Sequence, residues 1–184
     1  MMRLSLLSSC LLLLACCLAM LQPTDVNAQS NKSENRPVRA WVNLGIGSSG
    51  GDGLTAYSFI AHAQYNSRFG LLGLRYMRAD DSAIRGFWDY KDEIIELSLT
   101  YGFTYNYGIL NLSGSTGIGI LQGTQYGPSF MGGEIFRVAT FPVHGSIMIQ
   151  PLRFVGLGLM LSSSINSHTT IHSTSLVLQL GLVR

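Results

Sequence analysis

The C-terminal segment, residues 173–183, constrains the fold more than any other part of this chain. Large aliphatic side chains occupy every second position from Leu176 to Leu182, and the residues between them are small or uncharged. A period of two places alternate side chains on opposite faces of a β-strand. Because the face opposite the leucines carries no charged side chain, it does not have the composition of a strand surface bathed in water. The pattern therefore predicts an amphipathic strand whose leucine face meets hydrocarbon.

The first 28 residues have the organisation of a secretory signal peptide. A single basic residue, Arg3, precedes a short apolar core at residues 11–15, and Val26-Asn27-Ala28 offers small residues for cleavage after Ala28. The apolar core is shorter than the roughly 20 residues that a membrane-spanning helix needs. We expect a mature chain that begins at Gln29, with residues 29–37 as a disordered lead-in and residues 38–184 as one domain.

All three cysteines, Cys10, Cys16 and Cys17, lie inside this leader. Cleavage would therefore leave no thiol for a disulfide, a metal site or a nucleophile. Residues 13–16 also resemble a lipobox, so acylation of Cys16 stays open as the alternative. Charged residues make up 12% of the chain and the net charge is +2, too small and too dispersed to indicate a nucleic-acid partner. No residue spacing matches a metal or cofactor site.

Eight segments after the leader have period-two character, and no helical periodicity competes with them. They span about residues 38–47, 54–65, 69–78, 94–105, 108–121, 135–149, 154–162 and 173–183. Tight turns alternate with longer connections at 79–93, 122–134 and 163–172, with a shorter glycine-rich one at 48–53. Outer-membrane barrels combine short periplasmic turns with longer external loops. The order predicts an all-β, eight-stranded, antiparallel up-and-down transmembrane barrel with both ends on the short-turn side.

The parity of each strand assigns its two faces. The outward face is dominated by Leu, Ile, Val, Phe and Tyr, and the inward face by Gly, Ser, Thr and Asn with a few larger polar groups. Because an eight-stranded barrel is just wide enough for side chains to fill it, we expect a filled lumen and no pore. His62 and His144 should lie inside it as hydrogen-bonded core histidines. Pro142 removes a ladder donor in the sixth strand, which predicts a bulge or a local break there.

The signal peptide, the eight amphipathic segments, the alternating connections and the glycine-rich lumen together resemble the small OmpA/OmpX-type outer-membrane barrels. The resemblance covers residues 38–184 and implies an integral outer-membrane protein of a Gram-negative bacterium, monomeric and in contact with outer-membrane lipid. Such families commonly end in an aromatic residue, whereas this chain ends Leu182-Val183-Arg184. This departure bears on the assembly signal more than on the fold.

Arg75 and Glu96 are the opposite charges that parity directs inward on neighbouring strands. Folding the hairpin about the loop at 79–93 places residue 77 opposite 94 and Arg75 directly opposite Glu96, within reach of a cross-strand ion pair. We expect this pair to fill and cross-link the lumen, which is a structural role.

The candidate binding surface lies in the external loops. The connection at 79–93 interleaves Phe87, Trp88 and Tyr90 with charges of both signs, and Tyr126 and Phe130 in the next long loop could join them. Aromatic and charged residues together are typical of protein interfaces. The equally plausible interpretation is that these aromatics plug the barrel mouth or contact lipid headgroups. The expected role is therefore structural or surface interaction with an extracellular ligand or protein, without enzymatic activity and without a cofactor.

Two alternatives of other classes stay open. His168, His172 and Ser173 cluster around the last loop, as in an outer-membrane lipid-modifying hydrolase of the lipid A deacylase kind, but a triad needs an acid and none follows Glu134. We therefore assign no catalytic residue. A soluble lipocalin-like ligand-binding barrel would instead place the leucine rows inside, which is the observation that separates it from a membrane barrel.

Overall fold

The computed structural model describes residues 39–51, 54–67, 69–80, 93–126, 133–152 and 154–182. The expected signal peptide at 1–28 and the expected lead-in at 29–37 lie outside these residues. None of the described segments forms a helix that is long and apolar enough to cross a bilayer.

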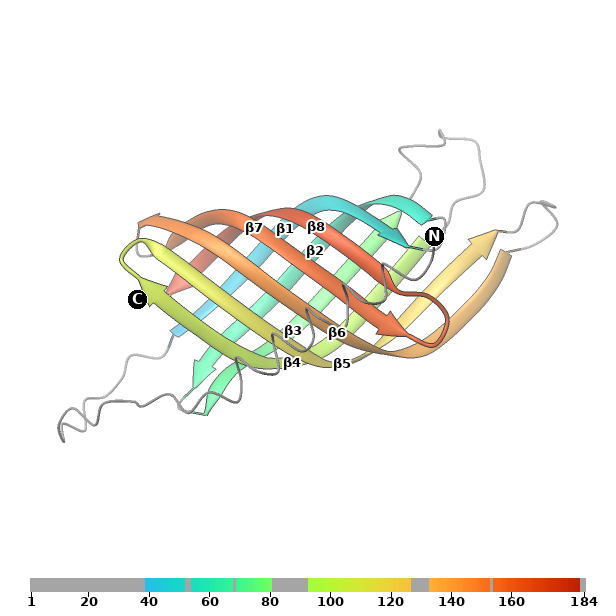
Figure 1. Cartoon of the computed structure of the whole chain (residues 1–184), viewed down its shortest axis with the longest axis horizontal. Helices are drawn as coiled ribbons and strands as arrows, with labels where there is room; N and C mark the ends of the chain where they lie inside the picture. Colours follow the sequence, from blue (N-terminus) through green and yellow to red (C-terminus); the bar gives the residue numbers. More distant parts are fainter. Residues whose placement is uncertain are drawn as a thin grey trace, which may run out of the picture. The chain divides into compact units, whose positions relative to one another are not determined.

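Eight strands follow one another along the chain and close on themselves, β1 pairing with β8 (Figure 1). Each neighbouring pair is antiparallel. The strands are β1 (Arg39–Gly51), β2 (Leu54–Ser67), β3 (Gly70–Asp80), β4 (Glu93–Tyr107), β5 (Leu110–Tyr126), β6 (Gly133–Leu152), β7 (Val155–Asn166) and β8 (Ile171–Leu182). The predicted eight-stranded up-and-down barrel is confirmed. The outer ends of β5 and β6 are longer than predicted and extend past their neighbours in Figure 1.

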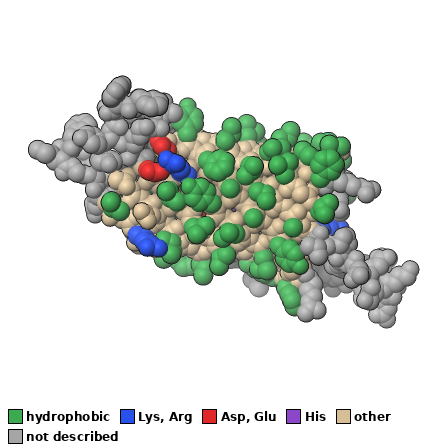
Figure 2. Space-filling view, turned by 180° about the vertical axis from the view of Figure 1, so that it is seen from behind, with side chains coloured by type: hydrophobic (Ala, Val, Ile, Leu, Met, Phe, Trp, Pro, Cys, Tyr) green, Lys and Arg blue, Asp and Glu red, His purple; other side chains and the backbone are tan. Residues whose placement is uncertain are grey.

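The outward face of the barrel is apolar, as the period-two pattern predicts. Leu176, Leu178, Leu180 and Leu182 all point outward, and Leu176 is 67% exposed. Figure 2 shows hydrophobic side chains spread over the barrel wall, while charged side chains gather toward its two ends. A surface of this kind is stable in lipid and not in water. This arrangement is the reverse of a lipocalin-like barrel, whose leucine rows would face inward.

Pro142 lies within a continuous β6, and the register shows what the missing N–H does. Thr116 pairs with Val143 and Gly119 with Thr140, so the register toward β5 is the same on both sides of the proline, while the two pairs between them are absent. The predicted bulge is therefore wrong at this position and the predicted local break is right. The register irregularity of β6 falls instead between Ile149 and Leu152, toward β7.

Candidate functional site

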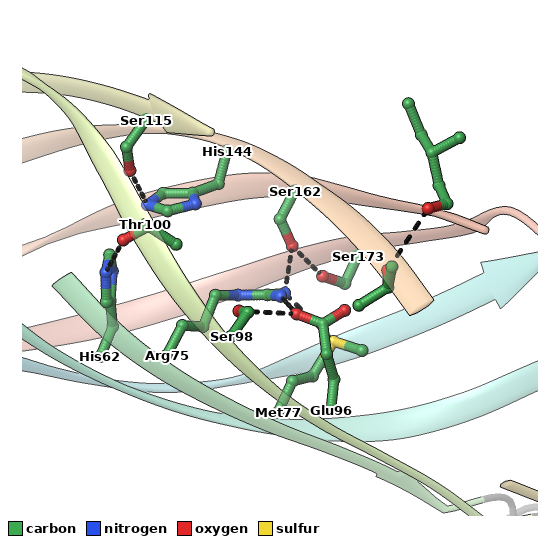
Figure 3. Close-up of polar contacts among 12 residues, drawn as sticks. His62, Arg75, Met77, Glu96, Ser98, Thr100, Ser115, His144, Ser162 and Ser173 are labelled. Carbon is green, nitrogen blue, oxygen red and sulfur yellow. Dashed lines mark hydrogen bonds and ion pairs between the residues drawn. The ribbon is translucent and has the colours of Figure 1, made fainter. Parts of the chain in front are cut away.

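The centre of the lumen is organised around one ion pair. Arg75 on β3 and Glu96 on β4 are both fully buried, and the Arg75 Nη1 donates to Glu96 Oε1 (Figure 3). The Arg75 Nη2 also donates to Ser162 Oγ on β7 at 3.0 Å, and Ser98 Oγ donates to Glu96 Oε1 at 3.1 Å. The guanidinium thus connects β3 to β4 beside it and to β7 across the lumen.

The register of this pair differs from the prediction by two residues. Arg75 lies opposite Ser98, and Glu96 lies opposite Met77, so the two charges meet diagonally and not face to face. The difference has a physical reason. A slip of one residue turns every side chain to the other face, whereas a slip of two leaves both faces unchanged. The alternation of residue types therefore does not distinguish the two registers, and long side chains reach the diagonal neighbour.

Two histidines occupy the lumen beside the ion pair. His62 Nε2 lies 3.1 Å from Thr100 Oγ1, and His144 Nε2 lies 2.5 Å from Ser115 Oγ. The two rings meet edge to face with centroids 4.6 Å apart. Gly73 lies on β3, between the strands of His62 and Thr100, and a Cβ there would overlap both side chains. No group of three His, Cys, Asp or Glu residues with metal-site geometry occurs in the described part of the chain.

The short-turn end of the lumen is closed by side-chain amides. Gln64 Oε1 accepts from Trp41 Nε1 at 2.8 Å and from Asn43 Nδ2 at 2.6 Å. Gln179 on β8 lies opposite Asn43 of β1, and Gln150 on β6 donates to Gln179. We call this set, with Asn111 and its contacts to Thr104 and Asn106, the amide network. It pairs part of the polar groups buried at this end, while Asn43 Oδ1, Gln64 Nε2, Asn111 Oδ1 and Gln150 Oε1 have no hydrogen-bond partner among the described residues.

The opposite end of the lumen holds an apolar cluster, which the sequence reasoning missed. Its buried apolar residues belong to one hydrophobic cluster, two partly buried side chains of β6 pack against it, and the buried Ser49, Ser58 and Ser164 lie beside it. We call the members nearest the loop ends of their strands the apolar cap: Ala56, Ala79, Ile94, Leu121, Ile171, Phe136 and Val138. A signal for the cap exists in the sequence. Pairs of adjacent large apolar residues, such as Ile94-Ile95 and Ile120-Leu121, interrupt the alternation where both faces are apolar.

Charged and hydrogen-bonding residues mark the outer rim of the lipid-facing wall. Arg78 Nε lies 2.8 Å from Glu93 Oε1, and Arg78 Nη2 lies 3.8 Å from Asp80 Oδ2. Ser163 Oγ lies 2.8 Å from His172 Nδ1 across β7 and β8. These groups stand where the exposed apolar rows end, so they indicate the level of the external headgroups.

The predicted binding surface falls largely outside the described residues. Phe87, Trp88, Tyr90 and Phe130 belong to connections that the structure does not describe. The backbone of Tyr126 ends β5 opposite Gly133, at the loop end of the barrel where we expected it. The proposed surface therefore stays a prediction from the sequence.

The residues considered for a hydrolase are not brought together. Ser173 is buried in the lumen, 2.5 Å from Ser162 Oγ, whereas His172 lies on the outer face against Ser163. His168 stacks on Phe136 with centroids 4.1 Å apart. Adjacent strand residues point to opposite faces, so His172 cannot serve Ser173 as a base.

Comparison with solved structures finds the same fold in small outer-membrane barrels. The chain is similar to Neisserial surface protein A, with 7% identity and a TM-score of 0.57 over 79% of this chain and 96% of that one. It is also similar to Ail, the attachment invasion locus protein of Yersinia pestis, solved with the heparin analogue sucrose octasulfate, with 14% identity and a TM-score of 0.56 over 79% and 99%.

The N-terminal barrel domain of Pseudomonas aeruginosa OprF gives 9% identity and a TM-score of 0.52 over 79% and 99%. No protein-family model and no curated protein sequence matches the chain. At these identities the likeness concerns the fold. The chain has the fold of the small eight-stranded outer-membrane β-barrel proteins.

Proposed function

We propose that this chain is an integral outer-membrane protein that serves envelope structure or surface interaction through its external end, and that it catalyses no reaction. The filled lumen carries the proposal. Arg75 and Glu96 join β3, β4 and β7 at its centre, the amide network closes one end and the apolar cap the other. A lumen packed in this way supports a rigid scaffold more readily than a path for solutes.

The external loops supply the interaction in this proposal. Phe87, Trp88 and Tyr90 would provide aromatic anchors, with Tyr126 and Phe130 from the neighbouring loop. The Ail structure with a heparin analogue concerns a protein of the same fold, and it supports a sulfated polyanion as the first probe. An extracellular protein is the other partner to test.

Two measurements test this function. In planar bilayers the purified protein should give no discrete conductance steps, whereas steady open-channel currents would contradict the scaffold role. Cells that display the chain should bind heparin-coated or matrix-protein-coated surfaces better than cells without it. The triple replacement Phe87→Ala, Trp88→Ala, Tyr90→Ala should abolish that gain.

Tyr105→Ala, an exposed aromatic on the lipid-facing wall, is the matched control and should bind as the parent does. If the parent binds neither surface, or if the control loses binding as fully as the triple variant, interaction through these loops is wrong.

A further inference from the structure

The three short turns of the barrel carry apolar tips. Phe69 is 70% exposed, and Ile109 and Phe154 are each 57% exposed. Turns that stand in water are built mainly from Gly, Pro, Asn, Asp and Ser. Further exposed apolar side chains surround the tips, namely Tyr107, Leu152 and Leu182. The apolar surface of the wall therefore continues around the rim at this end.

The carbonyl group of each tip residue accepts a hydrogen bond from within the protein. The Phe69 carbonyl accepts from the Tyr101 hydroxyl. The Ile109 carbonyl accepts from the Gln150 N–H at 2.7 Å, and the Phe154 carbonyl accepts from the Gly181 N–H at 3.0 Å. Backbone groups need internal partners where water is absent, while a turn in water can leave its carbonyls to the solvent.

The turn between β2 and β3 contains two further hydrogen bonds to its backbone. The Phe69 N–H donates to Ser67 Oγ at 3.1 Å, and Ser67 Oγ donates to the Gly70 carbonyl at 3.0 Å. One serine side chain thus serves two backbone groups of the same turn. Such serine-to-backbone bonds are ordinary turn chemistry, so they fix the shape of this turn, whereas the tips and their carbonyls indicate what surrounds it.

The height of the wall gives an independent argument. Phe154 precedes Ser163 of the outer rim by nine residues, and Phe69 precedes Arg78 by nine residues. At about 3.3 Å per residue and a tilt of about 40°, nine residues span roughly 23 Å of height. The apolar band of an outer-membrane barrel is about 25 Å tall. The apolar band therefore extends down to the level of the turn tips.

From these observations we propose that the short-turn end of the barrel is immersed in the hydrocarbon of the periplasmic leaflet, with Phe69, Ile109 and Phe154 as its inserted residues. The occupant of this surface is lipid because the exposed apolar tips, with Tyr107, Leu152 and Leu182 beside them, continue the apolar surface of the lipid-facing wall. Among the described residues, the surface that the barrel offers to a partner in water then lies at its external end.

Spin labels measure this depth directly. Phe69→Cys, Ile109→Cys and Phe154→Cys are labelled in protein purified from outer membranes and reconstituted into phosphatidylcholine vesicles. Accessibility is compared for oxygen, which concentrates in hydrocarbon, and for a water-soluble nickel chelate. Leu159→Cys on the lipid-facing wall and Ser167→Cys in the external turn are the matched references, and the unsubstituted protein gives the background from any retained leader cysteine.

The three turn labels should resemble the Leu159 label, with high oxygen and low nickel accessibility, while the Ser167 label shows the opposite. High nickel accessibility at the turns overturns the proposal, because the tips then stand in water. Low accessibility to both agents also overturns it, because the tips are then covered by protein.

A charge at the same position gives a second readout. Phe154→Asp should slow or prevent folding into vesicles, whereas Ser167→Asp should fold at the parental rate. Equal folding of both variants contradicts immersion even if the labelled proteins are difficult to prepare.

Discussion

The two ends of the lumen differ in the side chains that dominate them. At the short-turn end the amide network comprises Trp41, Asn43 and Gln64 on β1 and β2 and, beside them, Gln150 and Gln179 on β6 and β8. At the external end the apolar cap, with Leu121 and Ile94 fully or nearly fully buried, contains no side-chain hydrogen bond among its members. The end that faces external water is thus the one with the apolar cluster, and the end that lies in the membrane is the one with the amide network.

This difference shows that each end is sealed according to what surrounds it. Polar groups enclosed at membrane depth are stabilised by pairing with one another, and the amide network pairs part of them. At the outer rim, apolar side chains exclude water from the lumen through the hydrophobic effect, which operates only where water is present. The ion pair lies between the two seals.

The largest expected loss of stability comes from breaking the ion pair between Arg75 and Glu96, which lies between the amide network and the apolar cap. Glu96→Gln leaves the Arg75 guanidinium as an uncompensated buried charge, which should destabilise the barrel by about 3–5 kcal/mol. The shift in the urea unfolding midpoint of the barrel in detergent micelles measures this loss.

Glu93→Gln is the matched control on the same strand, because it breaks an exposed pair with Arg78 that is worth about 0–1 kcal/mol. The double variant Arg75→Met, Glu96→Leu should recover most of the stability, since it leaves no charge unpaired. Equal midpoints for Glu96→Gln and the parent would refute the role assigned to this pair.

The apolar cap should respond to truncation as a protein core does. Leu121 is completely buried, and Leu121→Ala should cost about 2–5 kcal/mol through lost burial and the cavity left behind. Its neighbour Ile120 points outward and is 47% exposed, so Ile120→Ala should cost clearly less in the same unfolding measurement. A similar loss at both positions would show that the cap is not packed as a core.

The strand count and the two faces were predictable because the period of two is strong wherever one face is apolar and the other is not. The cap was not predictable by the same rule, because at Ile94-Ile95 and Ile120-Leu121 both faces are apolar and the alternation disappears. Parity and the order of the strands predict that Arg75 and Glu96 lie in the lumen on neighbouring strands. Their register does not, because a slip of two residues exchanges Ser98 for Glu96 without changing either face.

The half of the lumen on the short-turn side, which we call the polar half, should tolerate no added volume. Gly158 lies opposite Met148, and an added Cβ would overlap the carbonyl oxygen of Ile147. Gly158→Ala should therefore cost about 1–3 kcal/mol. Gly145→Ala is the control, since its Cβ would lie 3.8 Å from the nearest atom, the Ser113 carbonyl oxygen. If the two alanines unfold at the same urea concentration, the tight packing inferred for this half is wrong.

The smallest effect should come from a single hydroxyl in the polar half. Ser113 Oγ and Ser146 Oγ lie 2.7 Å apart across β5 and β6, and both side chains are buried. Ser113→Ala should cost about 1 kcal/mol, because one hydrogen bond is lost and one hydroxyl is left without its partner. The double variant Ser113→Ala, Ser146→Ala should then lose less stability than the sum of the two single variants, since the second replacement leaves no further hydroxyl without a partner. Strict additivity in this cycle would mean that packing, and not the hydrogen bond, stabilises the short-turn half of the lumen, as it does the apolar cap. The two ends would then differ in composition and not in the forces that stabilise them.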